Sequence, residues 1–371
     1  MKLTVDRAAL LKALSHVQSV VERRNTIPIL SNVLITAAAD GVSFTATDLD
    51  IEIIDKADAD LGEPGVVTAP AHTLYEIVRK LPDGAEATLA TGADEARLTL
   101  SAGRSRFALP LLPPSDFPAM TADDFSHTFQ LEAETLARLI DKTRFAISTE
   151  ETRYYLNGVH LHALAGESPT LRAVATDGHR LALAETALPE GAAGLPGVIV
   201  PRKTVAELRR LLDDAEELID VSVSDAKIRF GLGRAVLTSK LIDGAFPDYE
   251  RVIPKQNDRV MAVDNKSFAQ AVDRVATISA EKSRSVKLTM DDDTLTFTVN
   301  NPESGQATEE MQVDFGGERL DIGFNARYLL DVTTQVEGEE AEFRFADAAS
   351  PTLIKDRGDD RALYVLMPLR V

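Results

Sequence analysis

Two groups of residues in this sequence have types and spacings that could support chemistry. His160 and His162 are two residues apart, so on a strand they lie on one face and could form half of a metal site. The alternative is a pair of surface or sheet-face histidines, because no third ligand type lies near them in the sequence. Asp48, Asp50 and Glu52 alternate in an acidic run, which favours a solvated outer strand that resists aggregation, with a Mg²⁺ site as the alternative.

Sequence motifs for catalysis are missing. The chain has no P-loop, no dinucleotide-binding glycine fingerprint, no G-x-S-x-G elbow and no H-E-x-x-H. It has no cysteine, which excludes disulfides, thiolate metal sites and a cysteine nucleophile. With 59 Asp and Glu residues, a carboxylate acid/base pair stays open, so a carboxylate-dependent hydrolase on a β-rich repeat scaffold is the alternative function. We expect no enzymatic activity, no cofactor and no metal.

Basic residues recur on the helices that we expect. Arg138 and Lys142 are four residues apart, and spacings of four and seven place side chains on one helix face. The other basic or polar residues at such spacings, or at helix ends, are Lys12 with His16, Arg202 with Arg209, Lys203 with Arg210, Gln270 with Arg274, Arg23 with Arg24, and Arg79 with Lys80. They are either solvated helix faces or contacts for phosphate, which Lys and Arg bind without regard to base sequence.

The elements that carry these residues repeat three times. Ala46-Thr47-Asp48 recurs as Ala175-Thr176-Asp177, and Thr298-Val299-Asn300 stands in the matching place further on. The strand-like segment 27–35 parallels 154–161. We therefore predict three diverged domains, at residues 1–125, 126–253 and 254–371, in each of which strands alternate with two helices.

Apolar periodicity locates these elements. Helices are predicted over 132–148 and 264–279 and after Pro70, Pro201 and Asn325, from apolar residues at three- and four-residue spacing. Strands are predicted where apolar and polar residues alternate, as in ARLTLSA, KLTM, LTFTV and AEFRF. The fold class that follows is α+β, with antiparallel sheets.

Charge and hydropathy limit the possible partners. The formal net charge is −19, from 40 basic and 59 acidic residues, and such a field repels DNA and anionic membranes at long range. An acidic exterior with a basic inner lining would hold DNA only once the DNA is inside. No stretch is apolar enough for a membrane span or a signal peptide, so we expect a cytoplasmic protein.

The chain ends in an apolar tail, ALYVLMPLRV. Terminal residues are usually mobile and polar, so this tail must dock or be recognised. Tyr364–Met367 could be a final strand that Pro368 stops, and the alternative is a short surface for peptide binding, since Met adapts to varied partners.

Several of these segments together resemble one family, the bacterial DNA polymerase III β subunits, or sliding clamps. The matching segments run in family order over essentially the whole chain: MKLTVDRAALLKAL, TIPILSNVLI, GRSRFALPLLPPSDFP, RYYLNGVHL, ATDGHRLAL, VIVPRKT, FPDYERVIP, NNPESGQATEEM and YVLMPLRV. The resemblance implies three repeated clamp domains per chain and a head-to-tail homodimeric ring, with helices lining the interior and antiparallel sheets outside.

The resemblance also implies function and partners. The ring would encircle double-stranded DNA topologically, tether the catalytic subunit of DNA polymerase III and so confer processivity. An ATP-dependent clamp loader would open it, and other replication and repair proteins with clamp-binding motifs would share its peptide site. Such a protein would be cytoplasmic and associated with the nucleoid during replication. The other reading from a different class is a purely structural repeat scaffold without nucleic acid.

The residues that match the family's functional motifs fall into two sets. A peptide pocket between the second and third domains would be formed by Leu156, Thr176, Gly178, His179, Arg180, Leu181, Pro247, Arg251, Val252, Tyr328, Val365, Leu366, Met367, Pro368 and Leu369. The DNA neighbours would be Arg24, Arg153, Tyr154, Tyr155, Arg202 and Lys203.

Physical chemistry agrees with the peptide role of part of the first set. The apolar members would receive apolar anchors, and Arg180 and Arg251 could meet peptide carbonyls or carboxylates. Without the resemblance, Gly178 is a plain Asp-Gly turn and His179 a surface histidine. Two departures from the family pattern stand out: Leu369 replaces a common methionine, and Glu150-Glu151 is unusually acidic for a loop near DNA.

Overall fold

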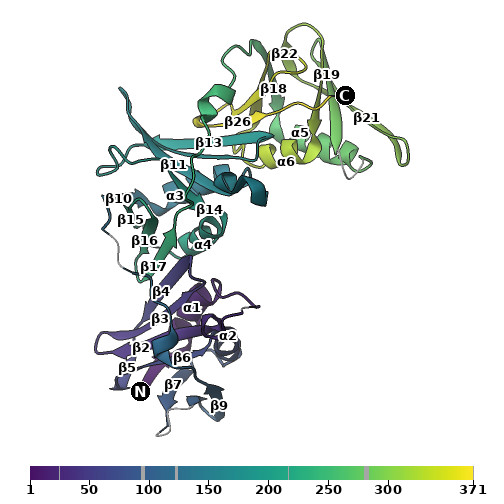
Figure 1. Ribbon diagram of the computed structural model, residues 1–371. Helices are drawn as coiled ribbons and strands as arrows, with labels where there is room; N and C mark the ends of the chain where they lie inside the picture. Colours follow the sequence, from purple (N-terminus) through teal and green to yellow (C-terminus); the bar gives the residue numbers. More distant parts are fainter. Residues whose placement is uncertain (25, 93–96, 122–123, 216, 280–283, 371) are drawn as a thin grey trace. The chain divides into compact units, whose positions relative to one another are not determined.

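The computed structural model describes residues 1–24, 26–92, 97–121, 124–215, 217–279 and 284–370. The chain divides into two compact units (Figure 1). Unit 1 consists of Met1–Leu136, Pro189–Ala192 and Lys203–Leu241, and unit 2 consists of Ala137–Leu188, Ala193–Arg202 and Ile242–Val371.

Unit 1 contains two antiparallel sheets. The first has the strand order β5 (Asp60–Glu63), β1 (Lys2–Asp6), β7 (Glu86–Thr91), β8 (Arg97–Ala102) and β9 (Ser105–Pro110). The second has the order β10 (His127–Glu132), β15 (Leu218–Val223), β16 (Lys227–Leu232), β17 (Ala235–Lys240), β4 (Ile51–Ala57), β3 (Gly41–Thr47), β2 (Asn32–Ala38) and β6 (Gly65–Pro70).

Unit 2 also contains two antiparallel sheets. The larger has the order β14 (Val198–Pro201), β11 (Gly158–Leu164), β12 (Thr170–Thr176), β13 (Arg180–Ala187), β26 (Asp359–Leu366), β25 (Thr352–Asp356), β24 (Glu340–Phe345), β18 (Arg259–Asp264) and β22 (Asp314–Gly316). The smaller has the order β21 (Gly305–Gln312), β20 (Thr294–Asn301), β19 (Ser285–Asp291) and β23 (Leu320–Asn325). These sheets confirm the antiparallel α+β class.

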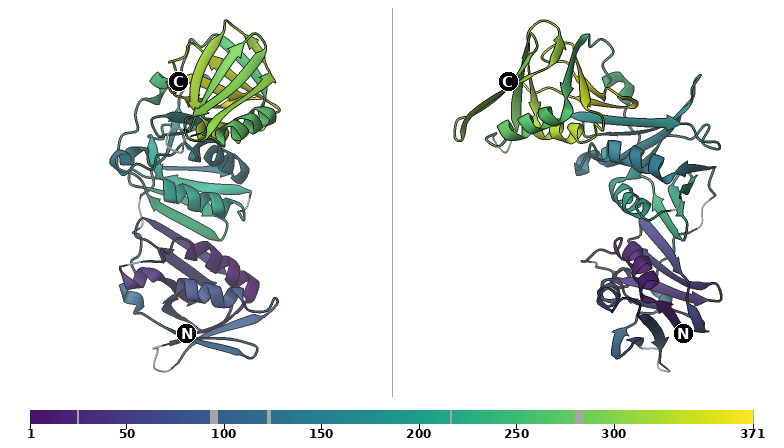
Figure 2. Two further views of the ribbon diagram at one scale, coloured as in Figure 1. Left: turned by 90° about the vertical axis from the view of Figure 1, so that its right-hand side faces the viewer. Right: turned by 180° about the vertical axis from the view of Figure 1, so that it is seen from behind.

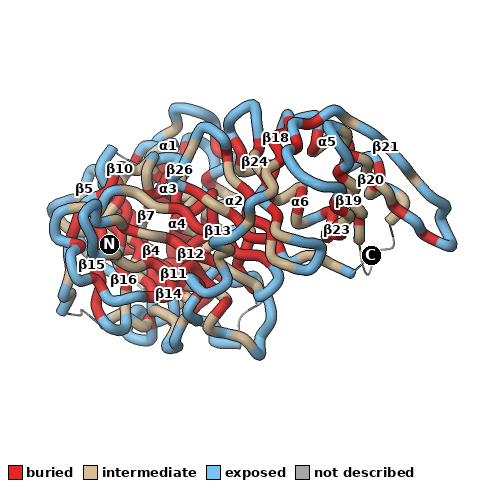
Figure 3. The backbone as a smooth tube through the Cα atoms, turned by 90° about the horizontal axis from the view of Figure 1, so that it is seen from above, coloured by how far each residue is buried: buried red, intermediate tan, exposed pale blue. Residues whose placement is uncertain are grey.

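Paired helices cover the sheets. In unit 1, α1 (Arg7–Gln18) packs against α2 (Ala71–Arg79) and against β3 and β4 (Figure 2). In unit 2, α5 (Asn265–Ala276) packs against α6 (Ala326–Thr333) and against β20. The remaining helices are α3 (Ala133–Arg144) and α4 (Arg202–Leu212). The strand interiors supply most of the buried residues, which are drawn red in Figure 3.

The helix starts follow from local chemistry. The Asp6 side chain accepts hydrogen bonds from the amides of Ala8 and Ala9 at the start of α1, and Asp264 accepts one from Ser267 at the start of α5. Such caps satisfy amides that have no partner within the helix. The structure confirms the predicted helices, although α3 ends at Arg144, before the predicted 148.

The sheets show how the repeats are joined. In unit 1, β17 from the second repeat pairs with β4 from the first. In unit 2, β26 from the third repeat pairs with β13 from the second. The second repeat therefore shares one sheet with each neighbour, which explains why the two compact units divide it between them.

A repeated turn confirms that these joints are equivalent. The Thr176 hydroxyl donates to the Arg180 carbonyl over 2.7 Å, and the Thr47 hydroxyl donates to the Ile51 carbonyl over 2.8 Å. Gly178 has φ +87°, and the matching Leu49 has φ +82°. A positive φ is strained for leucine. The shared geometry therefore comes from the equivalent surroundings of the turn in the two repeats and not from the type of residue at this position.

Two strand predictions differ from the structure. Segments 27–35 and 154–161 begin not as strands but with the 3₁₀ turns η1 (Pro28–Ser31) and η3 (Glu151–Leu156), and the strands start only at Asn32 and Gly158. Pro28 has no N–H to donate to a strand partner, which favours the turn.

The prediction that the acidic run forms a solvated outer strand is wrong. Asp48 and Asp50 lie in the turn before β4, and β4 itself is an inner strand between β3 and β17. Glu52 and Asp55 on β4 are buried, and burial raises the pKa of the Glu52 carboxyl. The Glu52 carboxylate accepts a hydrogen bond from the Met120 amide over 3.1 Å, so it is a satisfied structural group.

Candidate functional site

The apolar tail lies in unit 2, where β26 ends at Leu366. Beyond it, the Met367 amide donates to the His179 carbonyl over 2.9 Å, and the Leu369 amide donates to the Gly323 carbonyl over 2.8 Å. The predicted final strand is confirmed: β26 is the last strand of the chain and pairs with β13 and β25. Beyond it, Met367 is 42% exposed.

The tail is held against the turn between β12 and β13. In this turn the Asp177 carboxylate accepts from the amides of His179 and Arg180, at 2.9 and 3.0 Å. Gly178 has a positive φ, and a Cβ there would lie 2.4 Å from Nη1 of Arg153. Glycine is therefore favoured here by its backbone conformation, and any larger residue would also displace the end of the Arg153 side chain.

Arg180 is the most heavily bonded residue of the predicted pocket. It is only 8% exposed, and its guanidinium pairs with Asp177 at 3.1 Å and with Asp331 of α6 at 2.5 Å. It also donates to the Phe145 carbonyl over 2.6 Å. These bonds use three of the five N–H groups of the guanidinium, and they join β13 to α6.

The Tyr328 ring packs against the guanidinium group of Arg180. The Arg180 guanidinium is 4.3 Å from the centroid of the Tyr328 ring, a cation–π distance, and the His179 ring is 6.5 Å away on a nearly parallel plane. Partial burial raises the pKa of the Tyr328 hydroxyl. The orientation of this ring therefore depends on the buried Arg180.

The turn η4 (Tyr249–Val252) supplies the other predicted residues. Val252 is 48% exposed, and Arg251 is exposed and pairs with Asp248 at 2.6 Å. The neighbours Phe246 and Ile253 pack on a buried cluster that includes Leu181 and Val365.

The predicted pocket residues therefore separate into two layers around one core. The buried layer contains Leu156, Arg180, Leu181, Val365 and Leu366. The more accessible layer contains Thr176, Gly178, His179, Pro247, Arg251, Val252, Tyr328, Met367, Pro368 and Leu369. An exposed valine and methionine with an accessible arginine suit apolar and polar anchors of a short peptide.

His160 and His162 share a face of β11 as predicted, with ring centroids 4.7 Å apart. His160 also stacks on Phe246 at 4.6 Å, and burial lowers the pKa of His160 to about 4. His162 Nε2 is 2.9 Å from the Tyr249 hydroxyl. Within the described ranges, no three His, Cys, Asp or Glu residues are arranged to hold a metal ion. The pair supports the segment that carries Pro247.

Comparison with known proteins decides the family. The N-terminal, central and C-terminal domain models of the DNA polymerase III beta subunit match residues 1–121, 130–248 and 250–370. The chain is 64% identical to the beta sliding clamp of Caulobacter vibrioides and 41% identical to that of Escherichia coli K12, in each case over 100% of both chains. The chain belongs to the DNA polymerase III beta subunit family. As a beta sliding clamp, it is a non-catalytic processivity factor of DNA replication.

Solved clamp structures agree with this assignment. The DNA polymerase sliding clamp of Caulobacter crescentus has a TM-score of 0.96 at 64% identity, and the Bartonella birtlesii clamp bound to griselimycin has 0.97 at 49%. Both comparisons cover 100% of each chain. The alternative of a carboxylate-dependent hydrolase has no support among these relatives, and no helix in the described part of this clamp could span a membrane.

The predicted DNA neighbours of the clamp differ in how free they are. Arg24 and Arg202 are exposed, and neither has an ion pair among the described residues. Lys203 pairs with Asp48 and Glu22, and Arg153 pairs with Glu150 at 2.7 Å. Tyr154 is exposed, and its ring meets that of Tyr155 edge to face at 5.8 Å. The unusual Glu150 thus restrains a predicted DNA contact.

The expectation that the basic helix residues are solvated or contact phosphate is wrong for part of the set. Lys142 is buried, pairs with Glu337 at 2.6 Å and donates to the Gln335 carbonyl. Arg138 pairs with Asp359. Arg210 donates to the carbonyls of Ser15 and His16. These cations fasten neighbouring repeats, so part of the basic pattern serves assembly of the chain.

Sequence reasoning missed the acidic partners of Arg180. Asp177 precedes it in the ATDGHRL segment, and Asp331 lies three residues after Tyr328 on one face of α6. The three-residue spacing was a usable signal for Asp331. Phe145, whose carbonyl accepts from Arg180, carries no signal because any residue type offers that group.

Proposed function

We propose that two copies of this chain close head to tail into a ring around duplex DNA, and that partner proteins bind the tail surface of unit 2. The three domains would be residues 1–125, 126–253 and 254–371, close to the three family matches. The observation that carries the proposal is a pair of edge strands, β9 and β21. They are equivalent to the strands that join neighbouring repeats within the chain, but the described part of the chain gives them no such partner.

Each joint within the chain uses two equivalent strands. The last strand of one repeat, β17 or β26, pairs with the strand before the long crossover of the preceding repeat, β4 or β13. By the same rule, β9 is the last strand of the first repeat, and β21 is the receiving strand of the third. Both are edge strands, and a heterologous joint of this kind closes into a ring when the rotation allows.

The repeats also predict the register of this third joint. At the first joint Val236 lies opposite Ile54, and at the second the equivalent residues Leu363 and Leu183 lie opposite each other. Carried over to the free edges, Arg106 of one copy lies opposite Glu309 of the other. The two edges carry opposite charge, since β21 contains Glu309 and Glu310.

The helices also support a joint between the third repeat of one copy and the first repeat of another. His16 of α1 and Lys142 of α3 occupy one repeat position, and each reaches an acidic residue beyond the second helix of the next repeat. Arg274 occupies that position in α5 and pairs with Glu309 of β21, with Nε and Oε2 3.0 Å apart. In the proposed ring it faces the end of α2 of a second copy.

Exchanging the charges tests the register. Arg106→Glu places two carboxylates opposite each other at both interfaces of the ring, so we expect the dissociation constant of the dimer to rise about tenfold or more. Glu309→Arg should act alike, and the double variant should recover most of the affinity. Analytical ultracentrifugation measures the dimer, with Arg97→Glu on the inner strand β8 as the control. Failure of the double variant to recover would refute this register.

Retention on DNA tests the ring itself. Clamps placed on nicked circular DNA by a clamp loader should stay bound at high salt and be lost when the circle is cut, because topological holding does not need phosphate contacts. Equal loss from circular and linear DNA would contradict encirclement. Arg24 and Arg202, which lack ion pairs among the described residues, should contribute a salt-sensitive part of the contact.

The partners follow from the tail surface. We propose that the polymerase III catalytic subunit, the clamp loader and other replication and repair proteins present short peptides to Val252, Met367 and Arg251. Apolar side chains of such peptides would pack on the first two residues, and backbone carbonyls or carboxylates would meet the arginine. A protein with these partners works in the cytoplasm at the nucleoid.

A further inference from the structure

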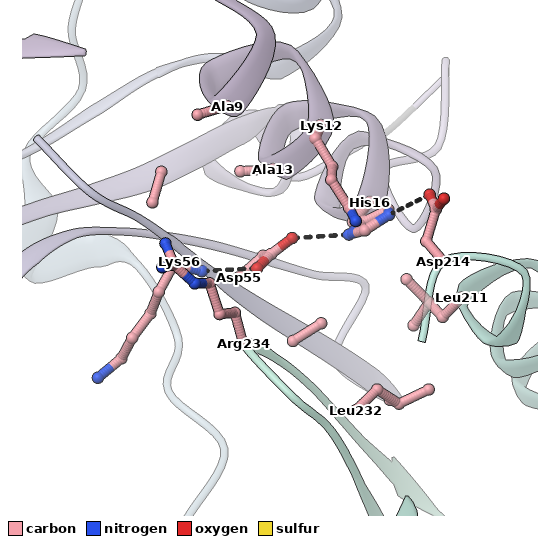
Figure 4. Close-up of a pocket in the computed structure, with 12 residues that line it drawn as sticks. Ala9, Lys12, Ala13, His16, Asp55, Lys56, Leu211, Asp214, Leu232 and Arg234 are labelled. Carbon is pink, nitrogen blue, oxygen red and sulfur yellow. Dashed lines mark hydrogen bonds and ion pairs between the residues drawn. The ribbon is translucent and has the colours of Figure 1, made fainter. Parts of the chain in front are cut away.

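A buried histidine connects the first two repeats in unit 1. His16 of α1 is 5% exposed and lies between two carboxylates, as Figure 4 shows. Its Nδ1 is 2.6 Å from Oδ2 of Asp55 on β4, and its Nε2 is 3.1 Å from Oδ2 of Asp214, which follows α4. Asp55 belongs to the first repeat and Asp214 to the second, so the imidazole ring bridges the joint.

Counting hydrogens fixes what this bridge requires. An ionised carboxylate only accepts hydrogen bonds, and a neutral imidazole carries a single N–H. The hydrogen bond from His16 is the largest cause of a lowered pKa at Asp214, so this carboxylate is ionised at neutral pH. The other Asp55 oxygen already accepts from the Lys56 amide over 2.7 Å. Both contacts are therefore satisfied when both carboxylates are ionised and both nitrogens of His16 carry a proton.

We propose that His16 is a proton-dependent latch between the first and second repeats: doubly protonated, it holds Asp214 to α1, and after loss of one proton it releases Asp214. The sign follows from the hydrogen count, so the latch is closed at lower pH and opens as the pH rises. Among the three equivalent positions, the second and third repeats carry Lys142 and Arg274, and the first alone carries an imidazole, the side chain suited to a change of charge near neutral pH.

The surroundings decide which contact breaks. The Asp55 side chain is buried, whereas that of Asp214 is 54% exposed. Leaving a buried carboxylate without a donor costs more than leaving one that water can reach. The remaining proton therefore stays on Nδ1, toward Asp55, and Nε2 loses its proton.

A cavity of about 330 Å³ beside the ring lets water follow this change. Charged groups face this region from every packed element: Lys12 from α1, Asp55 and Lys56 from β4, Arg210 from α4, Asp214 after it, and Arg234 from the β16–β17 turn. Arg210 keeps its bonds to the Ser15 and His16 carbonyls, so the change is confined to the end of α4.

Hydrogen exchange of the full-length protein tests the latch. The amides of Asp214 and Ala215 donate to the carbonyls of Leu211 and Leu212, at 3.2 and 3.3 Å, and report on the end of α4. Over roughly pH 5 to 8, where imidazoles change charge, we expect their protection, corrected for intrinsic exchange, to fall about tenfold as the pH rises, because one charge-assisted hydrogen bond is lost. The ¹⁵N signals of the His16 ring should show the second N–H vanishing over the same pH range.

Two variants separate the latch from ordinary packing. His16→Lys supplies a permanent cation, as Lys142 does in the second repeat, and should make protection independent of pH. Asp214→Asn replaces the carboxylate with an amide, which can accept from a protonated Nε2 or donate to a bare one, so it should also abolish the dependence at Ala215. The matched control Asp213→Asn, at a residue paired with Arg209, should keep it. Protection that does not change with pH in the natural protein, an unaltered pH dependence in His16→Lys, or a ring proton lost at a different pH would overturn the proposal.

Discussion

Deleting Met367–Val371 is expected to lower the affinity for partner peptides about a hundredfold or more while the dimer stays intact. Met367 and Val252 are the large apolar side chains of the predicted pocket that are exposed. Loss of a central apolar anchor costs about 2–4 kcal/mol in interfaces of this kind. The fold should survive, because β26 ends at Leu366 and keeps its pairing with β13 and β25. Fluorescence anisotropy with a labelled short peptide from the polymerase III catalytic subunit measures the affinity.

A shorter deletion is the matched control. Removing only Arg370 and Val371, of which Val371 lies outside the described residues, keeps Met367 and the Leu369 bond to Gly323. This variant should bind the peptide almost normally, and light scattering should find a dimer for both deletions. Undiminished binding by the longer deletion would show that the peptide site lies elsewhere.

The three repeats could be predicted because short sequence patterns indicate where their helices and strands lie. Helix starts at Arg202 and Ala326 follow from Pro201 and Asn325, and the alternating segments became strands. The predicted start of segment 27–35 was wrong because a local signal was overlooked: Pro28 has no N–H to donate, so a turn precedes the strand. The sharing of sheets between repeats was not predictable, since pairing of β17 with β4 depends on residues far apart in the chain.

The site shows the same limit more sharply. Resemblance identified Arg180, Leu181 and Val365, but nothing in the sequence indicates that they form a buried layer. Burial of Arg180 depends on Asp331, which lies far along the chain. The prediction for the acidic run was wrong for a related reason. The sequence favours a solvated Asp48, but the structure pairs Asp48 with Lys203, which lies far along the chain. Ion pairs between distant residues leave no periodic signal, so charge patterning alone overstates what is free to bind a partner.

Arg180→Ala is expected to be the most destabilising single substitution on the tail side of unit 2, at about 3–5 kcal/mol, because removing one partner of a buried ion pair leaves the others uncompensated. The Asp177 and Asp331 carboxylates and the Phe145 carbonyl would all lose a donor. Arg180→Lys should recover little, since one ammonium cannot reach acceptors spread around a planar guanidinium. Urea titration, followed by tyrosine fluorescence, gives the shift in midpoint.

The control for this substitution is Arg251→Ala. Arg251 is equally cationic and also ion-paired, but its side chain is exposed, so water takes the place of Asp248 and the midpoint should not move. Peptide affinity should also separate the two variants, because only Arg251→Ala weakens binding without lowering stability. Arg251→Ala weakens binding directly in a fully folded protein, whereas Arg180→Ala acts through Tyr328, whose ring loses the cation beneath it. Equal stability of the two variants would mean that Arg180 is not the residue that fastens β13 to α6.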